Sequence, residues 1–131
     1  MARAGIDVEI MKILTDYTEE IGREINEAGE RLTKQALKEL KEKSPKRVKY
    51  PKGMKPTYSK GWKLKKFGQR GTFRIVLHNA DRYMLTSILE HGFRHMPDKS
   101  FIPGREHIYP VQEKLNRDFE KAVEDIIKNN S

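Results

Sequence analysis

The chain has 131 residues, 36% of them hydrophobic and 35% charged, and its 27 basic and 19 acidic residues give a formal net charge of +8. This length predicts a single domain over residues 1–131 with a thin core, and a thin core favours a protomer that assembles with other subunits. The absence of cysteine excludes a disulfide framework and a thiolate metal site, which suits an intracellular protein. No apolar run approaches the roughly 18 residues of a membrane span, and no signal peptide is visible, so we expect a soluble protein without membrane contact.

Most of the excess positive charge lies in one segment. Residues 43–80 contain no acidic residue and twelve of the 27 basic residues, so the rest of the chain carries 15 basic and 19 acidic residues. We call this segment the basic block. Like charges gathered in one segment repel one another and stay solvated, which indicates a surface that meets an anionic partner. Nucleic acid and an acidic protein surface both suit it.

The first element that the sequence predicts is one long helix over residues 1–43. Its apolar residues recur every three or four positions, as on one face of a helix. They are Ile10, Leu14, Tyr17, Ile21, Ile25, Ala28, Leu32, Ala36 and Leu40. Gly22 and Gly29 lie beside this face, although each costs about 1 kcal/mol relative to alanine in a helix interior. Close approach of a neighbouring backbone would explain them, and so would a slight bend or an incidental surface position.

Ser44-Pro45 is expected to end this helix, because proline disfavours the helical conformation of the residue before it. Residues 44–57 contain three prolines and are predicted to form a basic loop. Residues 58–78 are predicted to form a β-hairpin, since two runs of alternating apolar and polar residues flank the turn at 68–71. The apolar positions are Trp62, Leu64, Phe73, Ile75 and Leu77. We interpret Trp62 as a core residue under the first helix, with base stacking as the alternative.

The last third of the chain is predicted to contain two helices. A short helix over residues 82–92 begins after Asp81 as its N-cap and is closed by Gly92. Residues 93–109 are predicted to be a loop, and a final helix over 110–129 begins at Pro110. Its apolar face is formed by Val111, Leu115, Phe119, Ala122, Val123 and Ile126. The predicted fold class is therefore α+β, with a long N-terminal helix, a basic loop, a small antiparallel β-hairpin or sheet, a short helix and a C-terminal helix.

No arrangement of residues predicts an enzyme, a metal site or a cofactor. His91 and His95 are four residues apart, but Gly92 and Pro97 separate them from a common helix, and no third ligand is evident. Glu106 and His107 are adjacent, so their side chains are expected to point apart, and no nucleophile accompanies them. We therefore assign no catalytic residue.

Several short segments follow one another in a fixed order along the chain. They are Leu37-Lys38-Glu39-Leu40, Ser44-Pro45-Lys46, Tyr58-Ser59-Lys60-Gly61-Trp62, His78-Asn79, Tyr83-Met84-Leu85-Thr86-Ser87-Ile88-Leu89-Glu90-His91-Gly92, and His107-Ile108-Tyr109-Pro110-Val111-Gln112-Glu113-Lys114. In this order the chain resembles the small tail-completion, or neck, proteins of long-tailed bacteriophages and prophages. The resemblance covers nearly the whole chain. It departs from the family in the longer loop after Ser44 and in Phe93-Arg94-His95-Met96, where the family is richer in glycine.

The resemblance implies a non-enzymatic virion protein that joins head and tail. Such proteins form homo-oligomeric rings, most often six-fold, between the head connector and the tail tube, and they contact neighbouring neck and tail proteins. DNA passes through the lumen of the ring with nonspecific contact. The resemblance thus implies a location in the virion, and in the host cytoplasm during assembly.

The residues expected to face DNA or to dock on a protein neighbour are the central basic residues of the basic block. They are Lys46, Arg47, Lys49, Lys52, Lys55, Lys60, Lys63, Lys65 and Lys66. A lumen that lets a polyanion slide needs weak phosphate contacts without base readout, and lysines provide them. An acidic neighbouring ring would suit the same lysines equally well. The alternative function is a small DNA- or RNA-binding protein that acts alone, although no helix-turn-helix or aromatic RNA-binding pattern is present.

Overall fold

The computed structural model describes residues 6–45, 57–68, 71–94, 98 and 100–130. The elements in chain order are β1 (Val8–Ile13), α1 (Glu19–Lys43), α2 (Thr57–Lys60), β2 (Trp62–Lys66), β3 (Thr72–Asn79), the 3-10 turn η1 (Tyr83–Leu85), α3 (Thr86–His91), β4 (Gly92–Arg94), β5 (Phe101–Pro103) and α4 (Tyr109–Asn129). The predicted α+β class is confirmed.

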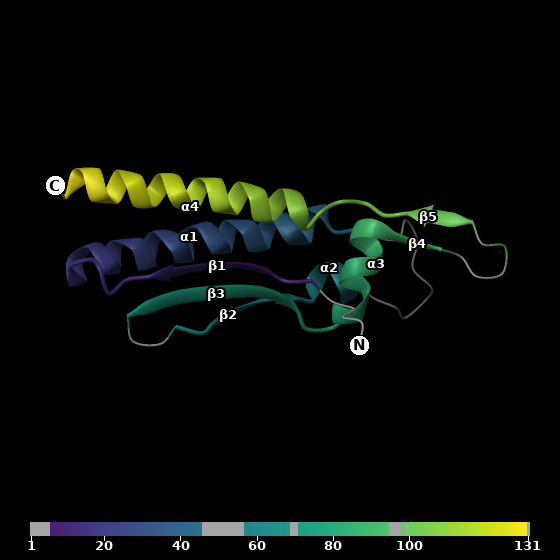
Figure 1. Cartoon of the computed structure of the whole chain (residues 1–131). Helices are drawn as coiled ribbons and strands as arrows, with labels where there is room; N and C mark the ends of the chain where they lie inside the picture. The colour runs from purple at the N-terminus through teal and green to yellow at the C-terminus, as the bar shows by residue number, and fades with distance from the viewer. Residues whose placement is uncertain (1–5, 46–56, 69–70, 95–97, 99, 131) are drawn as a thin grey trace.

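The main layer is a three-stranded antiparallel sheet with the order β1-β3-β2. Helix α1 lies along one face of this sheet, and α4 runs alongside α1 and meets the sheet at β1 (Figure 1). Helix α3 and the small β4–β5 ribbon lie at the end of the molecule opposite the C-terminus of α4 (Figure 1). We call the face of the main sheet that α1 covers the inner face and the opposite one the outer face.

The core lies between the inner face and the two long helices. Strand alternation sends every second side chain of the central strand inward, and Phe73, Ile75 and Leu77 are almost fully buried. Helix α4 completes the core, where the ring of Phe119 stacks on Phe73 with a centroid separation of 5.6 Å. The other core residues from these elements are Val8, Ile10, Ile25, Leu32, Ala36, Leu40, Tyr58, Trp62, Ile108, Val111, Leu115 and Val123.

The prediction of one helix over residues 1–43 is wrong at its beginning. Residues 8–13 form strand β1, in which Val8 and Ile10 are buried while Glu9 and Met11 are exposed. The misleading signal is the four-residue step from Ile10 to Leu14, because a step of four keeps a side chain on the same side in a strand and in a helix. The helix itself begins after Thr18, whose hydroxyl oxygen accepts the N–H of Ile21.

The end of α1 and the hairpin agree with the sequence prediction, with one local change. Ser44 adopts an extended conformation directly before Pro45 and ends α1 at Lys43. Strands β2 and β3 pair as the predicted hairpin, in the register Leu64 opposite Leu77. Residues 57–60, where the basic loop was expected to end at 57 and the hairpin to begin at 58, form the helical turn α2 instead. The predicted loop over 44–57 lies mostly outside the described residues.

Three predictions for residues 79–109 need correction. Asp81 is not an N-cap, since the side-chain oxygen of the buried Asn79 accepts the N–H of Arg82. The short helix at 82–92 consists of two pieces, η1 and α3, although Gly92 does close it with a positive φ of 90°. The predicted loop at 93–109 contains the paired strands β4 and β5. The final helix is confirmed, with Pro110 in its first turn.

The two helical glycines differ in their surroundings. Gly29 faces the Phe73 ring so closely that an added Cβ would overlap the ring, so a side chain, not a backbone, makes the close approach. At Gly22 an added Cβ would meet Leu14 at 3.8 Å, which is ordinary van der Waals contact. The packing of α1 on β3 therefore requires glycine at only one of these two positions.

Candidate functional site

The described lysines of the predicted site do not share one face. Lys60 is exposed at the end of α2, while Lys63 and Lys65 are exposed on the outer face of β2. Lys66 lies on the other side of β2 and pairs with Glu30 of α1. The remaining predicted site residues, Lys46, Arg47, Lys49, Lys52 and Lys55, lie outside the described residues.

Acidic residues of β1 and of the segment before it balance much of the charge on the outer face. Arg74 on β3 donates from Nε to Glu9 at 2.9 Å, and His78 lies 3.0 Å from Asp7. The residues of the basic block on this face therefore lie beside two carboxylates, Asp7 and Glu9, which come from outside the block. With Lys63 and Lys65 also counted, and His78 left out, the face carries one net positive charge.

The contact of Lys66 with Glu30 ties the basic hairpin to α1. The Lys66 ammonium, hydrogen-bonded to the carboxylate, holds the pKa of Glu30 below its usual value. An exposed pair of this kind contributes at most about 1 kcal/mol to stability. The pair nevertheless occupies the Lys66 ammonium. Among the described lysines of the predicted site, those without an acidic partner in the described structure are Lys60, Lys63 and Lys65.

A buried carboxylate holds the start of α4. Glu90 at the end of α3 is 3% exposed, and its two oxygens accept the backbone N–H groups of His107, Ile108 and Tyr109 at 2.8–2.9 Å. The first N–H groups of a helix have no partner within the helix, and a negative charge there also interacts favourably with the helix dipole. Glu90 therefore replaces the missing N-cap side chain of α4, since Ile108 occupies the N-cap position.

His107 connects this cap to α2. Its Nε2 lies 2.6 Å from the Tyr58 hydroxyl, and its Nδ1 lies 2.8 Å from the carbonyl oxygen of Arg105. Burial lowers the pKa of His107, so we assign the neutral ring, with Nδ1–H donating to the carbonyl and Nε2 accepting from Tyr58. Burial, with the nearby Glu90 charge as a smaller cause, raises the pKa of Tyr58, which keeps its hydroxyl protonated as a donor.

Two further buried hydrogen bonds complete what we call the polar junction, which consists of Ser44, Tyr58, Trp62, Asn79, Glu90 and His107. The indole N–H of Trp62 donates to the Ser44 hydroxyl at 2.9 Å. The side-chain amide of Asn79 donates to the Tyr58 carbonyl at 2.8 Å. Both bonds join the end of α1 or β3 to the segment at 58–62. The junction thus fixes α1, α2, β3, α3 and α4 relative to one another.

The chemistry of the polar junction is structural. Tyr58, Glu90 and His107 are each less than a tenth exposed, so no substrate reaches them in this conformation. The predicted separation of Glu106 and His107 is consistent with this arrangement, because the carboxylate beside His107 belongs to Glu90, at 3.0 Å. Sequence reasoning missed Glu90, although one signal was available: the helix that begins near Pro110 has no Ser, Thr, Asp or Asn before it to cap it.

Within the described ranges, no group of three or more His, Asp or Glu side chains is arranged to hold a metal ion. His95, one of the two histidines considered for such a site, lies outside them. Each helix in the described part of the chain is too short or too polar to cross a membrane. Comparison of the sequence with protein-family models and with curated proteins, and of the structure with solved structures, gives no match.

Proposed function

We propose that the protein is a structural component of a tailed-phage virion and forms an oligomeric ring in the neck, where tail-completion proteins join the head connector to the tail tube. The observation that carries this proposal is the ordered series of sequence segments from Leu37 to Lys114. In this role the protein catalyses no reaction and lets DNA pass through the ring.

The positions behind the resemblance support the proposal because they determine the fold of this chain. Tyr58, Trp62, Glu90 and His107 all belong to the segments that resemble the family, and all four are buried and hydrogen-bonded in the polar junction. A resemblance at such positions concerns the buried contacts that stabilise the protomer. It carries more weight than a likeness between exposed loops, which vary freely.

Over the described residues, the nearly balanced charge of the outer face also favours a passive role toward DNA. A protein that binds nucleic acid alone needs a patch of unpaired positive charge, because phosphate neutralisation supplies most of its affinity. Here Asp7 and Glu9 bring negative charge onto the hairpin face, next to His78 and Arg74. Exposed Lys63 and Lys65 remain for weak phosphate contacts or for an acidic neighbour.

The ring is tested by measuring the mass of the purified protein, alone and with the neck proteins encoded beside it. We expect an assembly of several copies, with six as the family's usual number, that forms alone or on a neighbouring ring. A lone monomer that binds duplex DNA tightly and sequence-selectively at physiological salt would contradict the proposal and favour the alternative function.

A variant of the basic block distinguishes the lumen from a docking surface. In it, Ser replaces Lys46, Arg47, Lys49, Lys52 and Lys55. Weak binding of free duplex DNA should lose part of its salt dependence in this variant, since fewer counterions are released. Incorporation of the variant into particles at the normal level assigns these residues to the lumen. Its exclusion from particles assigns them to an acidic protein neighbour.

A further inference from the structure

The β4–β5 ribbon projects from the end of the molecule where α3 lies, and Figure 1 shows it extending beyond the main sheet and the two long helices. Its strands contact mainly each other and α3. Of its described side chains, none belongs to the hydrophobic core, and Phe101 is 55% exposed. A two-stranded ribbon by itself is at best marginally stable in water. Among the described residues, the ribbon therefore has no layer to pack on.

The base of the ribbon is nevertheless fixed. Gly104 lies against the backbone of residues 90–92 so closely that an added Cβ would overlap it. The N–H of Arg105 donates to the carbonyl oxygen of Leu89 at 2.8 Å. Both contacts set the direction of the ribbon relative to α3 and the polar junction. A segment that is already held in one direction loses less entropy when it docks, which favours a role in binding.

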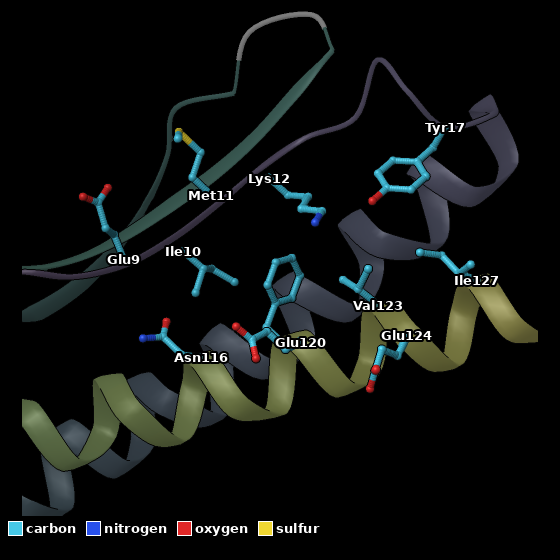
Figure 2. A pocket seen from close by; sticks show the side chains of 11 residues that line it. Glu9, Ile10, Met11, Lys12, Tyr17, Asn116, Glu120, Val123, Glu124 and Ile127 are labelled. Carbon is cyan, nitrogen blue, oxygen red and sulfur yellow. The ribbon is translucent and has the colours of Figure 1, made fainter.

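An open groove lies between β1 and the C-terminal half of α4 (Figure 2). It has a volume of about 650 Å³. Its apolar lining residues include Ile10 on β1 and Phe119 and Val123 on α4. The groove thus offers an apolar floor to a segment that carries exposed apolar side chains.

The β1 wall of this groove has unpaired backbone groups. The N–H and the carbonyl oxygen of Glu9 both bond to the Gln112 side chain of α4, at 2.9 Å each. In an antiparallel pair, alternate residues direct these groups to the same side, so those of Met11 and Ile13 also point away from β3. No described residue pairs with them. An occupant of the groove can therefore form hydrogen bonds as well as apolar contacts.

The free charge of the groove is mainly negative. Glu120 and Glu124 line it from α4, are exposed, and have no recorded partner among the described residues. The Glu9 carboxylate is already bound to Arg74 and does not count. Lys12 is the one basic residue among the described residues that line the groove. Two free carboxylates and one ammonium favour an occupant with positive charge.

The ribbon segment has this charge. In the sequence, residues 92–105 contain Arg94, Lys99 and Arg105 and only one acidic residue, Asp98. The ribbon and the groove also lie toward opposite ends of the molecule, because the groove follows the C-terminal half of α4 (Figure 1). The ribbon of a protomer therefore does not reach the groove of the same protomer, and a contact between them requires a second copy.

We propose that the β4–β5 ribbon of one copy of this chain binds in the β1–α4 groove of the next copy. The contact buries the exposed ring of Phe101 on the apolar floor and brings the basic segment to Glu120 and Glu124. It is heterologous, because each copy uses a different surface toward each of its two neighbours, and such contacts close into rings when the rotation permits. The inference rests on the proposed ring and names the surfaces that build it.

Two variants test this contact, Phe101→Glu in the ribbon and Glu120→Lys in the groove. Both side chains are exposed, so each variant should fold, which circular dichroism verifies. The first places a carboxylate beside the acidic groove, and the second places an ammonium beside the basic ribbon. Each variant alone should assemble roughly tenfold or more weakly than wild type in native mass measurements. An equimolar mixture should assemble again, since the new carboxylate then meets the new ammonium.

The matched control is Asp125→Lys, which reverses one exposed carboxylate of α4 outside the groove and should assemble as wild type does. If both test variants assemble as well as wild type, the ring stands and the ribbon–groove contact is wrong. A defect in either variant that mixing does not rescue also overturns the ribbon as the occupant.

Cross-linking locates the contact directly, because the chain has no cysteine of its own. A chain with Phe101→Cys and Glu120→Cys, treated with a short bismaleimide, should give a ladder of covalent oligomers on a denaturing gel. A chain with Phe101→Cys and Asp125→Cys should give no more product than the single-cysteine variants. Equal ladders from both pairs, or none from the groove pair while the ring forms, would overturn the contact alone. A wild-type protein that stays monomeric, alone and with its neck neighbours, instead refutes the proposed function and this contact with it.

Discussion

The buried hydrogen-bonding groups of the polar junction all have partners, whereas some backbone groups at the β1 edge have none among the described residues. In the junction, Glu90 satisfies three backbone donors, and the buried side-chain groups of the described residues all have partners. At the β1 edge, the backbone groups of Met11 and Ile13 meet no described partner, and their side chains are more than half exposed. Hydrogen bonding is thus complete within the protomer at the junction, whereas β1 leaves an open sheet edge beside α4.

Removal of the Trp62 side chain should cause the largest loss at the junction. The side chain is fully buried and donates to Ser44, so Trp62→Ala should reduce the free energy of unfolding by about 3–5 kcal/mol, measured by chemical denaturation. Trp62→Phe, which keeps an aromatic ring and loses the hydrogen bond, should lose clearly less. Near-normal stability of Trp62→Ala with loss of DNA affinity alone would overturn the core interpretation.

Loss of the Glu90 carboxylate should be almost as costly. Glu90→Ala leaves three buried or half-buried N–H groups at the start of α4 without their acceptor, and we expect a loss of about 3 kcal/mol. The control is Glu106→Ala, which removes an exposed carboxylate near the same helix end and should change stability by less than about 0.5 kcal/mol. Equal effects of the two substitutions would show that Glu90 acts only through its charge.

The two glycines of α1 should respond to alanine with opposite signs. Gly29→Ala gains helix propensity, but its methyl group overlaps the Phe73 ring, so a net loss of about 1–2 kcal/mol is expected in thermal unfolding. Gly22→Ala has room and should stabilise the protein by roughly 0.5–1 kcal/mol. Stabilisation by both substitutions would mean that α1 does not pack on β3 as described.

The smallest expected effect is a dependence of stability on pH at His107. Its pKa is lowered in the folded state from the ordinary value of 6.5, so below about pH 6.5 the unfolded chain binds the proton that the folded chain excludes. The stability that the neutral ring contributes is therefore present above this pH and lost as the pH falls. The urea midpoint of wild type should decrease between pH 7.5 and 5.5, and His107→Gln should decrease less. A parallel decrease in both proteins would assign the effect to other groups.

The sequence predicted the helices and the hairpin well, because their apolar positions repeat with the period of one structure. The stripe from Ile25 to Leu40 and the alternation around Phe73 each fit a single period. The segment before Thr18 was assigned wrongly because Ile10 and Leu14 fit both periods. The cap and acidic first turn at Thr18, Glu19 and Glu20 could have revealed the true start of the helix.

The candidate site was less predictable because it depends on contacts between distant segments. The charge balance of the outer face requires Asp7 and Glu9 to lie beside β3, some 65 to 71 residues further along the chain. The capping of α4 by Glu90 spans 17 to 19 residues and a ribbon that no local pattern indicates. Local propensity describes each element, but such pairings follow only from how the elements pack.

The most direct test of the open edge is amide hydrogen exchange along β1 in the isolated protein. The account predicts fast exchange at Met11 and Ile13, because their backbone N–H groups point away from β3 and have no described partner. Ile10 and Lys12, whose backbone groups face β3, should exchange slowly and serve as internal controls. Slow exchange at Met11 and Ile13 would contradict the account.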